Sequence, residues 1–424
     1  MSVYLGLGSN QGDRRANLET AIRSLGEAGF RIKKISPVVE SPAWLPLGAE
    51  AAWNKPYLNL ALDTEVEGGP LDILERVKRI ESEAGRVPSK RWSPRPLDID
   101  ILWWQGERFD HEKLQIPHPG ASERPFVLTP LMHLKPDLEI LGQSVLQRAA
   151  KAGSIPLWMA IVNATPDSFS DGGVWRDEAV LSEHLDQLLM LNVQILDIGA
   201  ESTRPRAEVV DPKQEWSRLK PVLDLVHSKL ADRSIRPWIS IDSRNPETLE
   251  KALDFGIDLL NDVTGLKDQA MVSMFRDSGL PVVAMHSLSV PVNPKLLLPD
   301  DQPAIQQIED WAQQSVDEWL AAGIDLNQII LDPGIGFGKT SIQAFNILQH
   351  CDRLRAMGCR TVIGHSRKSF MNNFCEQAFD DRDAETLGLS MALCEQGVDI
   401  IRVHDAVSHV RAYRAWSHVR QSQS

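Results

Sequence analysis

The last two thirds of this chain repeat one pattern, in which a short apolar segment is followed by a stretch with helical spacing. This alternation predicts parallel strands joined by helices, and about eight strands over roughly 250 residues predict a (β/α)8 TIM barrel. A doubly wound open sheet is the structural alternative, because the number of strands alone does not exclude it. The strand-like segments are Trp158–Asn163, Ile195–Gly199, Trp238–Asp242, Leu259–Val263, Val282–Met285, Ile329–Asp332, Val362–Gly364 and Ile400–Val403.

The first third of the chain follows another order of elements. Its apolar spacing indicates strand, helix, strand, strand, helix and strand, which predicts an α+β ferredoxin-like sandwich. The expected strands are Val3–Leu7, Arg31–Val39, Tyr57–Val66 and Leu97–Trp104, and the expected helices are Asn17–Leu25 and Pro70–Ile80.

Two domains also follow from the length, since 424 residues exceed what one hydrophobic core usually supports. The stretch from Leu134 to about Ile155 shows no strong element and marks the boundary. We therefore predict a first domain over residues 1–145, a linker over 146–155 and a barrel domain over 156–424.

The charge and the apolar runs exclude some classes of protein. A net charge of −13 argues against a nucleic-acid-binding protein, because neutralising phosphates needs a basic face. No apolar run approaches the roughly 20 residues of a membrane helix, and polar residues follow the N-terminus too soon for a signal peptide. The four cysteines lack metal-binding spacing, which favours buried, reduced thiols. We expect a cytoplasmic protein with small-molecule substrates.

Two carboxylates mark a candidate metal site in the first domain. Asp98 and Asp100 lie two residues apart on a predicted strand, so both project from one face. Such a pair suits Mg²⁺, whose coordination is completed by water and substrate phosphates. The alternative is an edge strand whose acids face solvent, and the pair alone does not decide between them.

Cations surround this pair in the sequence. Guanidinium groups suit bidentate contact with phosphates, so the set indicates a phosphoryl-transfer site. The cations are Arg86, Arg91, Arg95, His118 and Arg124. Tyr57 and Phe126 could hold a flat ring between them while Asn59 contacts its edge, although core packing is the alternative for the aromatic residues.

Three segments resemble 6-hydroxymethyl-7,8-dihydropterin pyrophosphokinase over about residues 1–140. They are Gly6-Leu-Gly-Ser-Asn10, Gly85–Asp100 and Pro117–Phe126. The resemblance implies transfer of pyrophosphate from ATP to the pterin hydroxymethyl group, with Mg²⁺ held by Asp98 and Asp100. It implies that Tyr57, Asn59 and Phe126 bind the pterin. The implied ATP-binding residues are Glu81, Arg86, Trp92, Arg95, His118 and Arg124, of which Arg86 and Arg95 also act in catalysis. Pro88 and Ser93 depart from the family pattern.

Polar residues end each predicted barrel strand, where the active sites of such barrels lie. Asp242, Asn261 and Asp332 supply acceptors for the ring N–H and amino groups of a heterocycle. The alternative is that these acids cap the following helices, which we prefer for Asp262. The polar, Gly-rich segments Asn163–Gly173 and Glu201–Pro205 have the composition of mobile lids.

Cations follow the last two predicted strands, where such barrels often bind phosphate. Convergence of Arg204, Lys368, Arg402 and His404 favours an anion site over solvated surface charge. Gly334–Thr340 invites interpretation as a nucleotide-binding P-loop. That motif needs a glycine where Pro333 stands, so we reject it.

Residues 156–415 resemble dihydropteroate synthase. The matching segments are Asn163–Gly173, Glu201–Pro205, Asp332–Lys339, Ser366–Ser369 and Ile401–Asp405. The resemblance implies a (β/α)8 barrel that condenses dihydropterin pyrophosphate with p-aminobenzoate, a sulfonamide-sensitive reaction, and it suggests a homodimer through the barrel. The implied pterin-binding residues are Asp242, Asn261, Asp332 and the catalytic Lys368. The implied pyrophosphate-binding residues are Asn163, which also contacts Mg²⁺, Thr203, Arg204, Arg402 and His404. The implied p-aminobenzoate-binding residues are Thr203, Pro205, Phe337 and Ser369.

The residues alone leave two alternative functions. The first domain could be a degenerate nucleotide-binding or dimerising module, which Pro88 alone encourages. A non-enzymatic pterin-binding protein would explain Tyr57, Asn59 and Asp242, but not the acid pair and its cations. His365 has no role that the pattern assigns, so a packing or rim histidine is the default.

Overall fold

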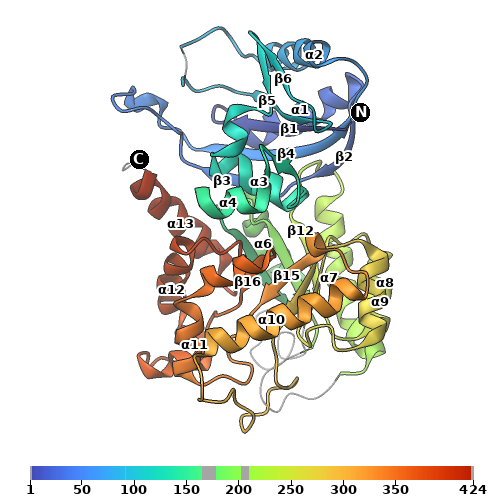
Figure 1. The fold of residues 1–424 in the computed structure, drawn as a ribbon, viewed down its shortest axis with the longest axis vertical. Helices are drawn as coiled ribbons and strands as arrows, with labels where there is room; N and C mark the ends of the chain where they lie inside the picture. Colours follow the sequence, from blue (N-terminus) through green and yellow to red (C-terminus); the bar gives the residue numbers. More distant parts are fainter. Residues whose placement is uncertain (1, 91, 165–177, 202–209, 422–424) are drawn as a thin grey trace. The chain divides into compact units, whose positions relative to one another are not determined.

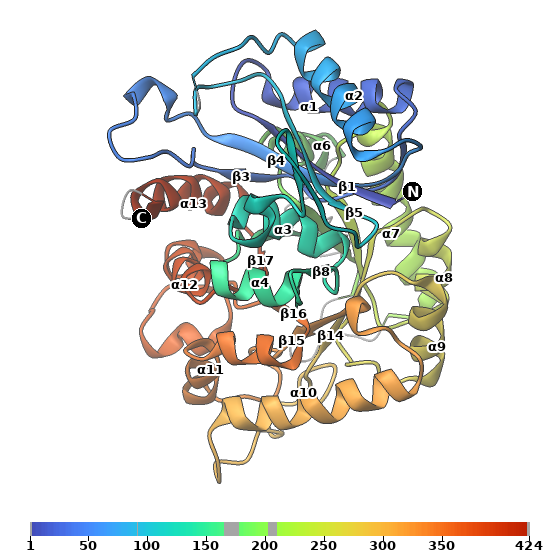
Figure 2. The same ribbon diagram turned by 45° about the horizontal axis from the view of Figure 1, so that its top comes forward.

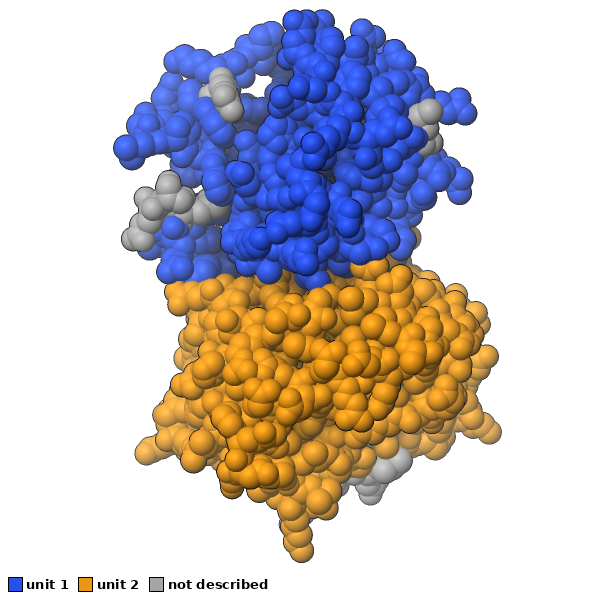
Figure 3. Space-filling model, viewed as in Figure 1, with its two compact units in different colours: residues 1–155, 233–236, 412–424 blue, residues 156–232, 237–411 orange. Residues whose placement is uncertain are grey.

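The computed structural model describes residues 2–90, 92–164, 178–201 and 210–421. The chain divides into two compact units, coloured blue and orange in Figure 3. Unit 1 contains residues 1–155, 233–236 and 412–424, and unit 2 contains residues 156–232 and 237–411.

Unit 1 is built on an antiparallel sheet with the strand order β2-β4-β1-β5, and a short strand β3 also pairs with β4. This is the order of a ferredoxin-like sandwich, so the predicted fold is confirmed. The strands are β1 (Ser2–Ser9), β2 (Arg31–Ile35), β3 (Val39–Ser41), β4 (Tyr57–Glu65) and β5 (Asp98–Trp104). The helices are α1 (Arg14–Glu27), α2 (Pro70–Glu83), α3 (Pro125–Leu134) and α4 (Val145–Ala152).

Alternation along the strands gives this sheet two apolar faces. Val3, Leu5 and Leu7 belong to a core that includes buried residues of α1 and α2. Tyr4, together with Leu102, belongs to a second core that includes residues of α3 and α4. The period of two therefore places helices on both faces of the sheet.

The stretch after Leu134 corrects one prediction, because it is not without regular structure. It contains the hairpin β8 (Glu139–Ile140) and β9 (Gln143–Ser144), followed by α4. Ser144 Oγ caps α4 by accepting a hydrogen bond from the backbone N–H of Gln147, and Gln147 Oε1 accepts one from the Ser144 N–H. This capping box is readable in the sequence, and Val145, Leu146 and Ala149 anchor the short helix by burial. The domain boundaries remain a prediction.

Unit 2 contains a closed barrel of eight parallel strands, in which the last strand pairs with the first. Closure excludes the open-sheet alternative and confirms the predicted barrel. The strands, within two residues of the predicted bounds, are β10 (Leu157–Asn163), β11 (Ile195–Gly199), β12 (Trp238–Asp242), β13 (Leu259–Asp262), β14 (Val282–Met285), β15 (Ile329–Asp332), β16 (Arg360–Ile363) and β17 (Ile400–Val403).

Helices surround the barrel strands (Figures 1 and 2). They are α6 (Glu178–Met190), α7 (Pro212–Leu230), α8 (Pro246–Leu253), α9 (Gln269–Ser278), α10 (Ala304–Ala321), α11 (Ser341–Leu348), α12 (Asp383–Glu395) and α13 (Ala406–Gln421). Within the described part of the chain, no helix is both long and apolar enough to cross a membrane. All four cysteines are free and buried, as predicted.

Candidate functional sites

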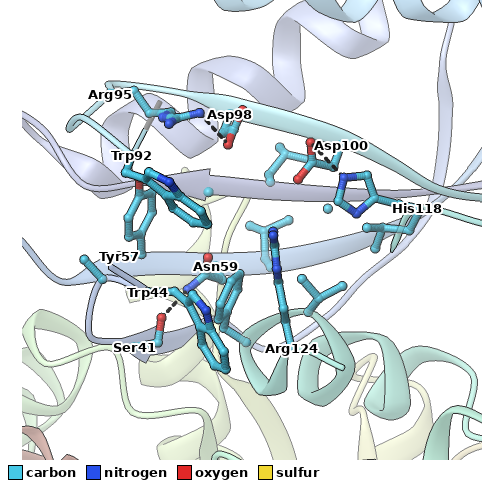
Figure 4. A pocket seen from close by; sticks show the side chains of 18 of the residues that line it. Ser41, Trp44, Tyr57, Asn59, Trp92, Arg95, Asp98, Asp100, His118 and Arg124 are labelled. Carbon is cyan, nitrogen blue, oxygen red and sulfur yellow. Dashed lines mark hydrogen bonds and ion pairs between the residues drawn. The ribbon is translucent and has the colours of Figure 1, made fainter. Parts of the chain in front are cut away.

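Unit 1 holds a pocket of about 300 Å³ over the sheet. Every residue that the sequence assigned to the first site lines it, except Glu81 and Arg91; the latter lies outside the described residues. The predicted residues that line the pocket are Tyr57, Asn59, Arg86, Trp92, Arg95, Asp98, Asp100, His118, Arg124 and Phe126. Figure 4 labels most of them around the pocket, to which β4, β5 and the segments beside them contribute.

The acid pair lies on β5 with different partners for each carboxylate. Asp98 Oδ1 lies 2.5 Å from Arg86 Nη1, and Asp98 Oδ2 lies 3.1 Å from Arg95 Nη1. Burial opposes the charge on Asp98, but Arg95 and Arg86 outweigh it and lower the pKa of Asp98. Asp100 has a weaker contact, with His118 Nε2 at 3.9 Å from its Oδ1.

Burial and the charge of Asp98 raise the pKa of Asp100. Two hard oxygen donors on one face, one of them disfavoured as an anion, fit a divalent cation that would neutralise both. The described residues contain no cluster of three or more acidic, histidine or cysteine side chains that could hold a metal. A metal held by two carboxylates would keep positions for water and phosphate oxygens, which is typical of Mg²⁺.

Glu81 does not share this pocket. Its side chain on α2 is 3% exposed and lies 2.6 Å from Arg86 Nη1, and it accepts a hydrogen bond of 2.8 Å from the Ile99 N–H. Lys78 also donates to this carboxylate. Glu81 is therefore a buried partner of Arg86, and its contact with ATP remains a prediction.

The other side of the pocket is aromatic. Phe126 lies 6.2 Å from Trp44, measured between ring centroids, and Arg124 lies 5.9 Å from the Phe126 centroid. Asn59 is buried, and its Nδ2 donates to Ser41 Oγ at 3.0 Å. A β-carbon on residue 8, which is glycine, would lie 3.3 Å from Asn59 Oδ1. A flat ring therefore has aromatic walls and an amide edge available, and Trp44 is a wall that sequence analysis missed.

The two departures from the family pattern lie in the segment after α2. Pro88 is exposed. Ser93 Oγ donates to the Lys90 carbonyl at 2.8 Å, and it also lies 2.8 Å from Ser89 Oγ. Trp92, which lines the pocket, has a positive φ of 75°.

In unit 2, the predicted pterin residues meet Arg402 at the ends of the barrel strands. Arg402 contacts Asp242 at 2.7 Å and Asp197 at 2.6 Å. Asn261 Nδ2 donates to Asp197 Oδ2 at 3.2 Å, and Ser240 Oγ donates to Asp197 Oδ1 at 2.6 Å. Asp197 is completely buried and was not predicted. Its carboxylate contacts both Arg402 and Asn261, which were predicted to bind ligands.

Burial shifts the pKa of three groups at this site. It raises the pKa of Asp242 to about 7, although Arg402 opposes the shift. It raises the pKa of Asp332, against Lys368, and lowers the pKa of Lys368 to about 8. A β-carbon on residue 364, which is glycine, would lie 3.9 Å from Asp332 Oδ2 and 3.8 Å from Arg402 Cδ. The acids and cations therefore share one small, desolvated space.

Phe337 and Lys368 form the neighbouring wall. Lys368 Nζ lies 4.9 Å from the centroid of the Phe337 ring and donates to the Ile335 carbonyl at 2.5 Å. Phe337 is 7% exposed and packs with Val263 and Met285. This arrangement places an aromatic face beside a cation.

The remaining predicted residues of the barrel divide into three groups. Ser366 Oγ lies 2.9 Å from His404 Nδ1, and Ser369 is exposed at the start of the following 3-10 helix (Ser369–Asn373). Asn163 lies at the end of β10. Thr203, Arg204 and Pro205 lie outside the described residues, as does most of Asn163–Gly173.

Two barrel residues have local structural roles. Asp262 accepts hydrogen bonds from the Thr264 and Leu266 N–H groups, so it holds the turn after β13. His365 is completely buried, with Nε2 3.1 Å from the Thr386 carbonyl, and burial lowers its pKa to about 4. Asp262 therefore has a structural role, but the helix cap expected of it is wrong, because Asp268 caps α9. His365 is a packing residue, as expected.

Comparison with known proteins matches both units. Residues 4–136 match the model of 7,8-dihydro-6-hydroxymethylpterin-pyrophosphokinase, and residues 159–404 match that of the pterin binding enzymes. The folate synthesis bifunctional protein of Chlamydia trachomatis is 35% identical to this chain, and the match covers 97% of each protein. The mitochondrial folate synthesis bifunctional protein of Arabidopsis thaliana is 31% identical over 95% of this chain and 80% of its own length.

Solved structures similar to unit 2 are dihydropteroate synthases. The Yersinia pestis enzyme in a sulfonamide drug complex has a TM-score of 0.58 and 29% identity, covering 67% of this chain and 99% of its own. The Xanthomonas albilineans enzyme with 4-aminobenzoic acid has a TM-score of 0.56 and 29% identity, covering 64% and 97%.

Proposed function

Because this chain belongs to the family of bifunctional folate-synthesis proteins, we propose that its two units catalyse successive steps of that synthesis. Unit 1 transfers pyrophosphate from ATP to 6-hydroxymethyl-7,8-dihydropterin and releases AMP. Unit 2 condenses the pterin pyrophosphate with p-aminobenzoate to give 7,8-dihydropteroate and pyrophosphate. The observation that carries this proposal is that each unit brings acids and cations of its predicted site together.

In unit 1, the substrates take opposite sides of the pocket. The pterin lies between the aromatic walls with its edge at Asn59, while the ATP phosphates face Arg86, Arg95, His118 and Arg124. Asp98 and Asp100 would hold Mg²⁺, which supplies charge neutralisation to the phosphates when it is bound. The pterin hydroxyl oxygen forms a bond to the β-phosphorus of ATP and loses its proton, and the bond from that phosphorus to the AMP oxygen breaks. The protein contributes mainly position and positive charge.

In unit 2, Asp242, Asn261 and Asp332 hold the polar edge of the pterin. The bond between the pterin methylene carbon and the pyrophosphate oxygen breaks, and the amine nitrogen of p-aminobenzoate bonds to that carbon and loses a proton. Arg402 and His404 favour departure of the leaving group by stabilising its charge. Asn163 would contact Mg²⁺, which would supply further stabilisation of that charge. Lys368 supplies a cation beside the reacting ring.

The wall formed by Phe337 supports a site for p-aminobenzoate, with Ser369, Thr203 and Pro205 as its other predicted members. An aromatic amine can stack on this ring. The sulfonamide complex of the Yersinia pestis relative makes sulfonamides candidate inhibitors of this chain as well. A cytoplasmic location and a homodimer through the barrel remain part of this proposal.

The proposal is tested in one coupled assay with ATP, hydroxymethyldihydropterin and p-aminobenzoate, in which AMP and dihydropteroate are both measured. Asp98→Ala with Asp100→Ala should abolish AMP formation, while dihydropteroate still forms from supplied pterin pyrophosphate. Lys368→Ala should leave AMP formation intact and impair dihydropteroate formation.

Each alternative predicts another result. Wild-type protein that makes dihydropteroate only from supplied pterin pyrophosphate would show a degenerate first domain. Binding of pterin without formation of either product would indicate a non-enzymatic pterin-binding protein. Loss of both activities in a folded Asp98/Asp100 variant would contradict independent sites.

A further inference from the structure

Lys339 is a buried lysine to which neither proposed reaction assigns a role. It lies in the Gly334–Thr340 segment, which follows β15 and resembles a nucleotide-binding loop without its spacing. Lys339 is only 7% exposed. Burial of an amino group is costly unless polar groups compensate for the lost water, so its contacts need an explanation.

Three acceptors surround the amino group. Lys339 Nζ lies 2.8 Å from His286 Nδ1, 3.4 Å from the His286 carbonyl oxygen and 3.0 Å from the Phe337 carbonyl oxygen. A protonated lysine has three N–H groups for three acceptors, and a neutral one can accept from the imidazole instead. In either charge state, Lys339 joins the Phe337 peptide group to the residue that follows β14.

The backbone around this connection is closely confined. Gly334 and Gly338 have φ values of 64° and 75°, and a β-carbon on them would lie 2.0 Å from the His286 carbonyl oxygen and 2.6 Å from Leu288. The His286 N–H also donates to the Asp332 carbonyl at 2.9 Å. The segment after β15 is therefore held against the end of β14 on both sides of Phe337.

Phe337 depends on this arrangement for its direction. Its carbonyl is bound by Lys339 and its N–H donates to the Gly334 carbonyl at 3.0 Å, so both of its peptide groups are fixed. Its ring lies 4.9 Å from Lys368 Nζ, measured to the ring centroid, and packs in a cluster with Val263 and Met285.

We propose that Lys339 is a positioning residue of the synthase site, which fixes the Phe337 ring as the face on which the aminobenzoate ring stacks. This inference rests on the proposed function of unit 2. It differs from a purely structural role because it predicts an effect on one substrate. Asp242, Asn261 and Asp332 bind the pterin without Phe337, so the pterin should be nearly unaffected.

The test is a double-mutant cycle of Lys339→Met and Phe337→Ala, read as separate KM values for p-aminobenzoate and pterin pyrophosphate. Lys339→Met keeps the length of the side chain but removes its N–H donors. We expect it to raise the KM for p-aminobenzoate about tenfold and to change the KM for pterin pyrophosphate less than threefold. In the Phe337→Ala background, it should change the p-aminobenzoate KM less than twofold.

Lys267→Met is the matched control, because Lys267 Nζ donates to the neighbouring Ser287 carbonyl at 2.8 Å but does not contact Phe337. It should leave both KM values unchanged. Lys339→Gln, which retains N–H donors, should lie between wild type and Lys339→Met, and it replaces Lys339→Met in the cycle if that variant does not fold.

Additive effects of the two substitutions, or equal changes in both KM values, would overturn the role of Lys339. A p-aminobenzoate KM that Phe337→Ala leaves unchanged would instead refute the aromatic face in the proposed function. An effect of Lys339→Met in that case would show that it does not act through Phe337.

Discussion

The cation on Lys368 should control the rate and the pH dependence of the condensation. Lys368→Met is the informative change, because it removes the ammonium and keeps an aliphatic stem at the place where Lys368 Cδ faces Gly336. Removing one pre-organised electrostatic contact typically costs about 10²–10³ in kcat. Arg402 stays bound to Asp197 and Asp242 and leaves a second cation nearby, so we expect the lower end, about a hundredfold or 2.7 kcal/mol.

The pH dependence follows from the lowered pKa of Lys368, about 8, which burial causes. The charged form then outnumbers the neutral form about tenfold at pH 7, and the ratio is reversed at pH 9. Because the cation is lost as pH rises, the wild-type rate should fall about tenfold between pH 7 and pH 9. Lys368→Met should lack this decrease, so the ratio of the wild-type rate to the variant rate should be about tenfold smaller at pH 9 than at pH 7.

The assay is dihydropteroate formation from supplied pterin pyrophosphate, with AMP formation in unit 1 as the internal control. A lowered lysine pKa means that the folded state binds this proton more weakly than the unfolded chain does. The folded state therefore gains stability as pH rises through this pKa, and Lys368→Met should not lower the midpoint of thermal unfolding at pH 7. A loss below about tenfold at pH 7, or an unchanged rate ratio at pH 9, would refute this account of Lys368.

Three further predictions concern other parts of the two sites. Asp197→Asn should weaken the binding of pterin pyrophosphate and lower the free energy of unfolding of the barrel by about 3 kcal/mol, because it leaves Arg402 with one acid fewer in a buried network. Calorimetric titration and urea unfolding measure the two effects, and an unchanged affinity would disprove the role of Asp197. Sulfonamides should raise the KM for p-aminobenzoate without changing kcat, and inhibition that is indifferent to p-aminobenzoate would contradict a shared site. Pro88→Arg should change the KM for ATP only modestly, because Arg86 and Arg95 already contact Asp98. If the wild type forms no AMP and Pro88→Arg restores this activity, unit 1 is a degenerate enzyme.

Much of both sites was predictable, because strand geometry fixes where side chains point. A separation of two residues on β5 places Asp98 and Asp100 in one pocket. Closure of a parallel barrel brings Asp242 and Arg402 together although they are far apart in the chain. These placements depend on periodicity and topology, both of which are visible as patterns in the sequence.

Other features depend on tertiary contacts that no local pattern reveals. Asp197 lies inside an apolar strand, and only the barrel shows that Arg402 reaches it. Trp44 lies in a segment without periodicity, so its approach to Phe126 was not predictable. The burial of Glu81 was predictable, because Ile73, Val77, Ile80 and Glu81 are spaced as the buried face of a helix.

Because the last barrel strand pairs with the first, the barrel closes only after β17 has been synthesised. β17 emerges from the ribosome roughly 240 residues after β10, a delay of about 12 to 48 s at about 5–20 residues per second. During this interval the growing sheet has open edges, which are prone to wrong pairing. Arg402 arrives with the closing strand, so the barrel completes its fold and its reactive site in one late event. The sheet of unit 1, in contrast, has all its strands by residue 104.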